Sequence, residues 1–342
     1  MKLATLKDGS RDGQLAVVSR DLSTAHYASG IATRMQQLLD DWNFLSPQLE
    51  DLYATLNDGK ARHAFPFEPR QCMAPLPRAY QWADASGYLR HVALVRRARG
   101  AEMPADAHAE PLMYQGGSDA LLGPCDDAVF ADEDDGIDFE AELAVVTGDV
   151  PIGATPAQGL EAVRLLLLVN DWTLRERVPR EMAKGFGFVQ SKPATAFGPA
   201  AVTPDELGAA WSGGRVCLPV VSRWNGRQMG APDAGEGMDF PFGTLIAHLA
   251  ATRQVRAGSI VGGGTVSNAD PARGCSCIAE QRAREIIESG SARTGWMRFG
   301  DTIRIEVTDR HGCSVFGAIE QRVVGRAEAQ SSPHPTAGPE LP

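Results

Sequence analysis

The alternation of hydrophobic and polar positions divides the chain into a short first part and a longer part that is rich in strands. Two short β-forming runs, KLATL and QLAVVS, lie within residues 1–20 on either side of the turn-forming segment DGSRDG. Hydrophobic residues then recur at roughly helical spacing through residues 29–57. We therefore expect a small N-terminal domain of α/β type over residues 1–70.

A proline-rich segment, HAFPFEPRQCMAPLPRA at residues 63–79, follows this domain. We expect irregular structure here, because proline fixes φ and lacks a backbone donor. We interpret the segment as the linker to a main domain over residues 71–326. Strand-like runs dominate that domain, and most are separated by turn residues. They are ELAVVTG, LLLLVND, RVCLPVVSRWNG, SIVGGGTVS, TIRIEV and SVFGAIEQRV.

Two helices are predicted among these strands. One spans about residues 155–164 and opens with Thr155 as N-cap and Pro156 in the first turn. The other is FGTLIAHLAATRQV, residues 242–255. The elements together predict a mainly β domain with some helices, which is the α+β class. Residues 327–342 are rich in proline, serine and alanine, and we expect them to be disordered.

Composition narrows the classes of function. The net charge of −10 and the pI near 5.2 argue against a nucleic-acid partner. The N-terminus has no apolar core typical of a signal peptide, and the longest apolar run, LLLLV at 165–169, is too short to span a bilayer. The six cysteines form no CxxC pair, which is typical of reduced thiols. We therefore expect a cytoplasmic protein without a membrane partner.

The segment DFEAELAVV, residues 138–146, carries two acidic residues inside a run that otherwise predicts a buried strand. Glu140 and Glu142 are two positions apart and so point to the same face of a strand. Two carboxylates this close raise each other's pKa unless a cation lies between them. On this motif alone, an edge strand whose polar face meets water remains an alternative.

A third acid follows another apolar run. LLLLVND ends in Asn170 and Asp171, and an acid at the end of a buried strand can reach a pocket, although it can also form an ordinary turn. Three carboxylates make a hard oxygen site that suits Mg²⁺ or Ca²⁺ rather than Zn²⁺. We interpret Cys275 and Cys277, which have no partner pair nearby, as structural thiols.

The order of these motifs resembles the fumarylacetoacetate hydrolase family. DFEAELAVV followed by VNDWTLRE resembles the family's Glu-x-Glu strand and its second strand, which ends in Asn-Asp with an arginine four residues on. The resemblance extends over about residues 71–325 and includes the segments QSKPATAFGP and GGGTVSN. It implies that Glu140, Glu142 and Asp171 bind a divalent metal, that Lys192 is catalytic, and that Arg175 and Thr265 bind substrate.

A further segment resembles the branch of the family that contains fumarylacetoacetase. In WADASGYLRHV, His91 follows Asp84 by seven residues, which implies that Asp84 is a fourth metal ligand and His91 the general base. SCIAEQR implies that Glu280 orients His91, since a histidine base needs an acid to fix its tautomer. Taken singly, His91 could instead be a packing histidine and Glu280 an ordinary carboxylate at a helix start.

Residues that would contact substrate follow the family less closely. PLMYQGG implies that Tyr114 binds substrate. In RRAR, the three arginines Arg96, Arg97 and Arg99 stand where the family has one carboxylate-binding arginine. Arg177 and Val178 replace the glutamine that the family carries shortly after the Asn-Asp pair.

The resemblance implies a mixed β-sandwich roll, a homodimer, and a metal-dependent hydrolase. The substrate would be a small β-diketo acid such as fumarylacetoacetate, cleaved at a carbon–carbon bond during the breakdown of tyrosine or other aromatic compounds. Acylpyruvate hydrolysis, decarboxylation, isomerisation and hydration of a related 2-oxo acid remain alternatives, because fold analogy does not settle the reaction. A non-catalytic metal-bound binding protein is an alternative of another class. The spacing of Asp84 and His91 argues against it, because a binding module has no need of a base.

Overall fold

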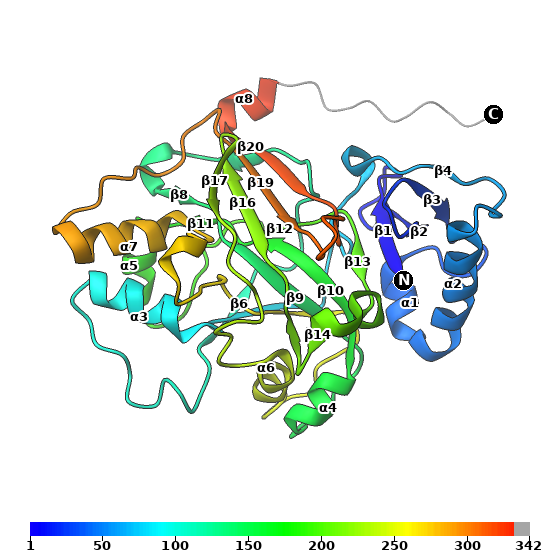
Figure 1. Cartoon of the computed structure of the whole chain (residues 1–342), viewed down its shortest axis with the longest axis horizontal. Coiled ribbons are helices and arrows are strands. Elements are labelled where there is room, and N and C mark those ends of the chain that lie inside the picture. Colours follow the sequence, from blue (N-terminus) through cyan, green and yellow to red (C-terminus); the bar gives the residue numbers. More distant parts are fainter. Residues whose placement is uncertain (332–342) are drawn as a thin grey trace.

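A mixed sheet of 11 strands runs through the whole molecule in the computed structural model, which describes residues 1–331 (Figure 1). The path is β4-β3-β2-β1-β13-β10-β9-β18-β5-β6, and β12 pairs with β10 outside this path. The strands are β1 (Lys2–Leu6), β2 (Gln14–Val18), β3 (Thr24–Tyr27), β4 (Phe65–Pro66), β5 (Gln81–Ala85), β6 (Met113–Gly116), β9 (Ala141–Thr147), β10 (Val163–Asn170), β12 (Ala196–Phe197), β13 (Ala201–Val202) and β18 (Ser259–Gly262).

A second sheet of five strands, in the order β17-β16-β19-β20-β7, packs on one face of the first. It consists of β7 (Ala128–Phe130), β16 (Val220–Trp224), β17 (Arg227–Gly230), β19 (Thr302–Val307) and β20 (Ile319–Gly325). Two short pairs complete the strands: β8 (Ile137–Asp138) with β11 (Thr173–Leu174), and β14 (Trp211–Ser212) with β15 (Arg215–Val216).

Strand β10 shows why the LLLLV run has no alternation of polar and apolar residues. Leu166 and Leu168 belong to the core between the two sheets, whereas Leu165 and Leu167 belong to the core on the opposite face. A strand that is buried on both faces is hydrophobic at every position. The central position of β10 therefore follows from its sequence.

The N-terminal part is a continuation of the main sheet. Strand β1 pairs antiparallel with β13, and Leu3 lies opposite Ala201. The expected helical stretch 29–57 forms two helices, α1 (Met35–Asp40) and α2 (Trp42–Asn57), whose apolar residues share one core with β9 and β10. Within the proline-rich segment, β4 contains Pro66 and forms an edge of the sheet, where a missing donor is tolerated, and Pro69–Gln71 forms a 3₁₀ turn.

Both predicted helices are present, as α4 (Pro156–Glu161) and α6 (Phe242–Leu249), and Thr155 with Gln158 forms a capping box at the start of α4. Between residues 71 and 325 there are also α3 (Leu89–Ala98) and α5 (Val178–Met182), which were not expected, and α7 (Ile278–Ser289), of which the sequence analysis considered only a helix start near Glu280. Helices α3 and α7 pack against each other at one end of the molecule (Figure 1). The chain also forms 3₁₀ turns at Glu133–Asp135, Pro204–Ala210 and Pro271–Arg273.

We expected the disordered tail to begin at residue 327, but residues Arg326–Ser331 form helix α8. The rest of that tail, 332–342, lies outside the described residues. Within residues 1–331, no helix is both long enough and apolar enough to cross a membrane. The six cysteines all lie in this range and are free thiols.

Candidate active site

Three of the predicted acids meet where neighbouring strands of the large sheet end or pass each other. Glu142 lies on β9 opposite Val169 of β10, Asp171 directly follows β10, and Asp84 lies on β5. Strand β18 separates β9 from β5, but its residue Gly262 has no side chain. A Cβ atom at Gly262 would lie 2.1 Å from Oδ1 of Asp84, so the carboxylate occupies the space that this glycine leaves.

These three acids form a compact oxygen site. Carboxylate oxygens of Asp84, Glu142 and Asp171 lie within 4.8 Å of one another, and all three residues are buried. Oδ1 of Asp84 and Oε2 of Glu142 have no hydrogen-bond partner among the described residues. Burial, together with the neighbouring acids, raises the pKa of Asp84 and of Glu142 well above the ordinary values. Buried oxygens without partners fit a hard divalent cation, which prefers carboxylate ligands.

Glu140 lies beside this site but is paired with cations of the protein itself. Nη2 of Arg175 donates to Oε1 of Glu140 at 2.6 Å, and the Lys192 ammonium donates to Oε2 of Glu140 and to Asp171. Burial alone would raise the pKa of Glu140, but Arg175 and Lys192 outweigh it and the pKa is lowered. Asp171 and Glu140 in turn raise the pKa of Lys192, despite its burial.

Hydroxyl groups hold the acids in place. Thr265 donates to Oε1 of Glu140 at 2.9 Å and to Oε1 of Glu142 at 3.2 Å. Tyr114 donates to Oδ2 of Asp171 at 2.5 Å, and burial and the charge of Asp171 raise the pKa of Tyr114 well above its ordinary value. Thr195, which the sequence did not single out, donates to Oδ1 of Asp171 at 2.8 Å. The hydroxyls of Tyr114 and Thr265 therefore orient the carboxylates.

His91 and Glu280 are brought together by helices α3 and α7. Nδ1 of His91 on α3 lies 3.1 Å from Oε2 of Glu280 on α7, whose side chain is 0% exposed. Arg284, one turn further along α7, donates to the other oxygen, Oε1, at 2.6 Å. Burial raises the pKa of Glu280, but the bonds from His91 and Arg284 outweigh it and the pKa is lowered. An ionised Glu280 holds the proton on Nδ1 and leaves Nε2 of His91 free to act as a base.

Residues 81–324 match the family model described as fumarylacetoacetate (FAA) hydrolase C-terminal, and residues 1–78 match fumarylacetoacetase N-terminal domain 2. The chain belongs to the fumarylacetoacetate hydrolase family. No curated protein matches the sequence. The family membership and the expected mixed-sheet fold are thus confirmed.

Several solved structures share this fold along 95% of the chain. Maleylpyruvate hydrolase from Sphingobium sp. SYK-6, solved in complex with a manganese(II) ion and pyruvate, has 19% identity, a TM-score of 0.64 and 99% of its own chain covered. 5-Carboxymethyl-2-hydroxymuconate delta-isomerase from Mycobacterium smegmatis has 16% identity, a TM-score of 0.60 and 99% coverage. 2-Hydroxyhepta-2,4-diene-1,7-dioate isomerase from Mycobacterium marinum has 15% identity, a TM-score of 0.57 and 99% coverage. Identities this low establish the fold alone.

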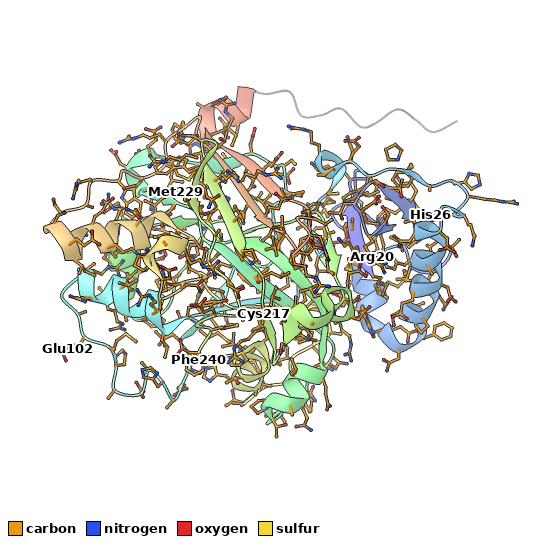
Figure 2. The ribbon with its side chains drawn as sticks, viewed as in Figure 1. Arg20, His26, Glu102, Cys217, Met229 and Phe240 are labelled. Carbon is orange, nitrogen blue, oxygen red and sulfur yellow. The ribbon has the colours of Figure 1, made fainter. Side chains whose placement is uncertain are left out.

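Of the three arginines in the RRAR segment of this family member, Arg99 has Arg175 among its charged neighbours. Partial burial, together with the positive charge of Arg175, lowers the pKa of Arg99. Nη1 of Arg99 lies 3.8 Å from the sulfur of Met182 on α5. Arg96 donates to the carbonyl of Glu102, which lies on an outer loop (Figure 2), and Arg97 is exposed, as is Arg99.

Other site residues of this family member could not be predicted from the sequence because their partners are distant in the chain. Asp138 binds Arg175 and the start of α7, and Arg284 binds Glu280. Cys277, which we had interpreted as structural, accepts a hydrogen bond from the backbone of Glu280. A ring nitrogen of His91, a carboxylate oxygen of Glu140 and the sulfur of Cys277 also lie within 4.8 Å of one another, so the histidine is close to the acids. Of these hydrogen-bonding acids and bases, only Asp138 lies in the acidic strand motif of the sequence analysis, DFEAELAVV.

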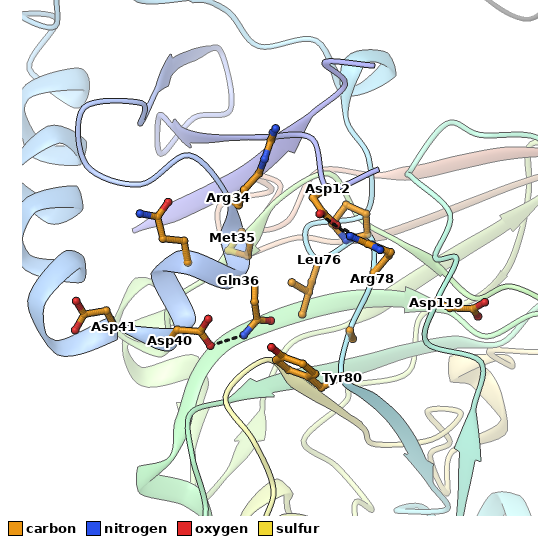
Figure 3. A pocket seen from close by; sticks show the side chains of 13 residues that line it. Asp12, Arg34, Met35, Gln36, Asp40, Asp41, Leu76, Arg78, Tyr80 and Asp119 are labelled. Carbon is orange, nitrogen blue, oxygen red and sulfur yellow. Dashed lines mark hydrogen bonds and ion pairs between the residues drawn. The ribbon is translucent and has the colours of Figure 1, made fainter. Parts of the chain in front are cut away.

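Two large cavities lie away from these residues, against the N-terminal part of the molecule. A cavity of 760 Å³ is lined by residues that include Arg34, Arg78 and Tyr80 (Figure 3). A cavity of 1100 Å³ is lined by residues that include Arg20 and Cys217, both of which are labelled in Figure 2. No predicted site residue lines either cavity. The acid cluster is the better candidate for the active site, because perturbed pKa values and convergent polar groups mark such sites.

Proposed function

We propose that this protein is a metal-dependent hydrolase that cleaves a carbon–carbon bond in a β-diketo acid of the fumarylacetoacetate or acylpyruvate type. The observation that carries the proposal is the His91–Glu280 pair beside the acid cluster. Isomerisation or decarboxylation of a 2-oxo acid does not require a base that activates water, whereas hydrolysis does. Hydration requires one as well, and it differs from hydrolysis in leaving the oxygen of water in a hydroxyl group. A non-catalytic binding protein would have no use for the pair at all.

Asp84, Glu142 and Asp171, with Glu140 at their side, would hold the metal, which we propose to be Mg²⁺ or Ca²⁺. When bound, a divalent ion supplies Lewis-acid polarisation of the two oxygens of a 1,3-dicarbonyl unit. The manganese complex of the maleylpyruvate hydrolase from Sphingobium supports a divalent ion in this fold. The unpartnered oxygens of Asp84 and Glu142 support it in this chain.

The protein's own residues would then perform the proton transfers. Glu280 holds the proton on Nδ1 of His91, so that Nε2 accepts a proton from water and the resulting hydroxide adds to a carbonyl carbon. The carbon–carbon bond breaks with its electron pair remaining on the departing carbon, which takes the proton back from His91. One water is consumed and two carbonyl products leave. Lys192 is placed to stabilise negative charge on oxygen.

Substrate contacts can be assigned to residues that remain available. Nε and Nη2 of Arg175 are bonded to Asp138 and Glu140, so we assign Arg175 to support of the site rather than to the substrate carboxylate. Arg99, on the same side, is the proposed carboxylate-binding residue. Tyr114 and Thr265 point their hydroxyls at the acids and would contact the substrate oxygens next to them.

The test is a product assay in isotopically labelled water. Purified protein with Mg²⁺, Ca²⁺ or Mn²⁺ is incubated with fumarylacetoacetate, acylpyruvates, maleylpyruvate and oxaloacetate. Hydrolysis places one labelled oxygen in a carboxylate product, whereas an isomerase or decarboxylase yields products without that label. Absence of turnover across the panel would favour the binding protein. We also propose a homodimer, which light scattering on the purified protein tests.

A further inference from the structure

Asp138, the first residue of the DFEAELAVV segment, is a buried acid that the proposed mechanism does not use. Its side chain is 0% exposed and it lies on β8, two residues before Glu140. Oδ1 accepts the backbone N–H of Ile278 at 2.7 Å, and Oδ2 accepts that of Ala279 at 2.9 Å. These are the first two residues of α7, so an acid from a distant strand caps this helix.

The cap determines where Glu280 lies. The first turn of a helix leaves backbone N–H groups without partners inside the helix, and a negative charge there is stabilising. The N–H of Glu280 itself donates to the sulfur of Cys277 at 3.3 Å. Cys277 in turn forms an isolated β-bridge with Glu140. The start of α7 is therefore attached directly to the strand segment that carries the acids.

Arg175 connects this cap to the acid cluster. Its Nε donates to Oδ2 of Asp138 at 2.8 Å and its Nη2 donates to Oε1 of Glu140 at 2.6 Å. One guanidinium therefore neutralises the carboxylate that caps α7 and the carboxylate of Glu140, one of the predicted metal ligands. Without it, Asp138 would be buried without a cation, which is costly, and Glu140 would keep only Lys192.

We infer that Asp138 is a positioning residue for the general base, acting through the start of α7 on Glu280 and from there on His91. The inference rests on the proposed function, because it assigns His91 the role of base. Asparagine cannot replace Asp138, since it has one acceptor oxygen and would turn an amide toward one of the two N–H donors or toward Arg175. The carboxylate with two acceptor oxygens is therefore required.

The kinetic test is a double-mutant cycle of Asp138→Asn and Glu280→Gln. In the native background, D138N is expected to lower kcat by about 10²-fold with KM unchanged, as misplacement of a catalytic group does. In the E280Q background it is expected to lower kcat no further, and the affinity for Mn²⁺ in calorimetry is expected to stay the same. An equal loss in both backgrounds, or a loss of Mn²⁺ affinity at unchanged kcat, would overturn the inference.

A spectroscopic readout separates this inference from the proposed function. The downfield NMR signal of the Nδ1 proton of His91 is expected in the native protein and lost in both D138N and E280Q. Persistence of the signal in D138N refutes the positioning role even if no substrate is found. If the native protein turns over no diketo acid, the proposed function is wrong. The NMR signal then tests by itself whether Asp138 positions His91 through Glu280.

Two further variants control for folding. Ile278→Pro removes one N–H that Asp138 accepts while keeping the carboxylate and Arg175. Proline is favoured at the first position of a helix, and the preceding residue, Cys277, is extended as a residue before proline must be. This variant is expected to weaken the signal and lower kcat in the same direction as D138N, and unchanged values would contradict the inference. Asp132→Asn changes an exposed acid that caps the 3₁₀ turn at Glu133–Asp135, and is expected to leave kcat and the NMR signal unaltered.

Discussion

Nδ1 of His91 lies 3.1 Å from Oε2 of Glu280, although 189 positions separate the two residues in the chain. The pair is formed by α3 and α7, which pack against each other at the end of the molecule where the acids gather. This contact is what distinguishes the site from a simple metal site, because it supplies a base of defined tautomer next to carboxylates that can hold a cation.

His91→Ala is expected to lower kcat by about 10²- to 10⁴-fold, which is the range for loss of a general base. Metal binding should persist, since the acids that would hold the ion are unchanged. Steady-state kinetics and Mn²⁺ calorimetry check both points. His108→Ala, on an exposed loop, is the matched control and should behave as the native protein does. Full turnover by the His91 variant would remove this residue from the mechanism.

Gly262→Ala is expected to disrupt the acid cluster. The added Cβ would lie 2.1 Å from Oδ1 of Asp84 and 2.6 Å from the ring of Trp82, so the carboxylate must move. A misplacement of about 1 Å in a catalytic group can cost about 10²-fold in rate. Calorimetry should therefore record weaker Mn²⁺ binding, and kcat should fall. Gly295→Ala, where a Cβ meets nothing within 4 Å, is the control. Unaltered Mn²⁺ affinity would show that Asp84 is not a ligand.

The contribution of Asp84 and Glu142 to the stability of the metal-free protein is expected to fall as the pH rises. Burial raises the pKa of Asp84 and of Glu142 well above the ordinary values of 3.8 and 4.5. The native state then keeps protons that the unfolded chain has released, so the contribution of these two acids to the free energy of unfolding is greatest below these ordinary values and decreases as the pH rises through the raised pKa values. Urea denaturation in a chelator at a series of pH values measures this slope.

Two additions sharpen the pH experiment. Saturating Mn²⁺ should reduce the slope, because a bound cation pairs with the ionised acids and stabilises the native state. The double variant Asp84→Asn and Glu142→Gln should also reduce it, because neither amide titrates. A slope that is the same in native and double-variant protein would show that other groups cause the pH dependence.

Lys192→Ala is expected to destabilise the metal-free protein by about 3–5 kcal/mol, the usual effect of removing one partner of a buried ion pair. The loss should be smaller with Mn²⁺ present, because the ion replaces part of the positive charge that Asp171 and Glu140 lose. Thermal unfolding with and without Mn²⁺ gives both values. Lys184→Ala, at an exposed position of the same segment, should leave stability unchanged. Equal destabilisation with and without the ion would show that the ion does not replace the positive charge of Lys192 beside Asp171 and Glu140.

Local patterns in the sequence predicted much of the fold and part of the candidate site. Strands β9 and β10 follow from ELAVVTG and LLLLVND, since strand periodicity and burial on both faces are visible in neighbouring residues. The same periodicity placed Glu140 and Glu142 on one face. The order of short motifs was enough to indicate the family, which the matches over residues 1–78 and 81–324 confirm.

Only the tertiary structure decided which charges pair. The sequence suggested one cation opposite both glutamates, yet Glu140 is bound by Arg175 and Lys192, while Glu142 keeps an unpartnered oxygen beside Asp84. Hydrophobic periodicity did not indicate helices α3 and α7, because their polar residues His91 and Glu280 face each other rather than water. Hydrophobic periodicity is a property of adjacent residues, whereas the pairing of buried charges depends on strand register and helix packing between segments that are far apart in the chain.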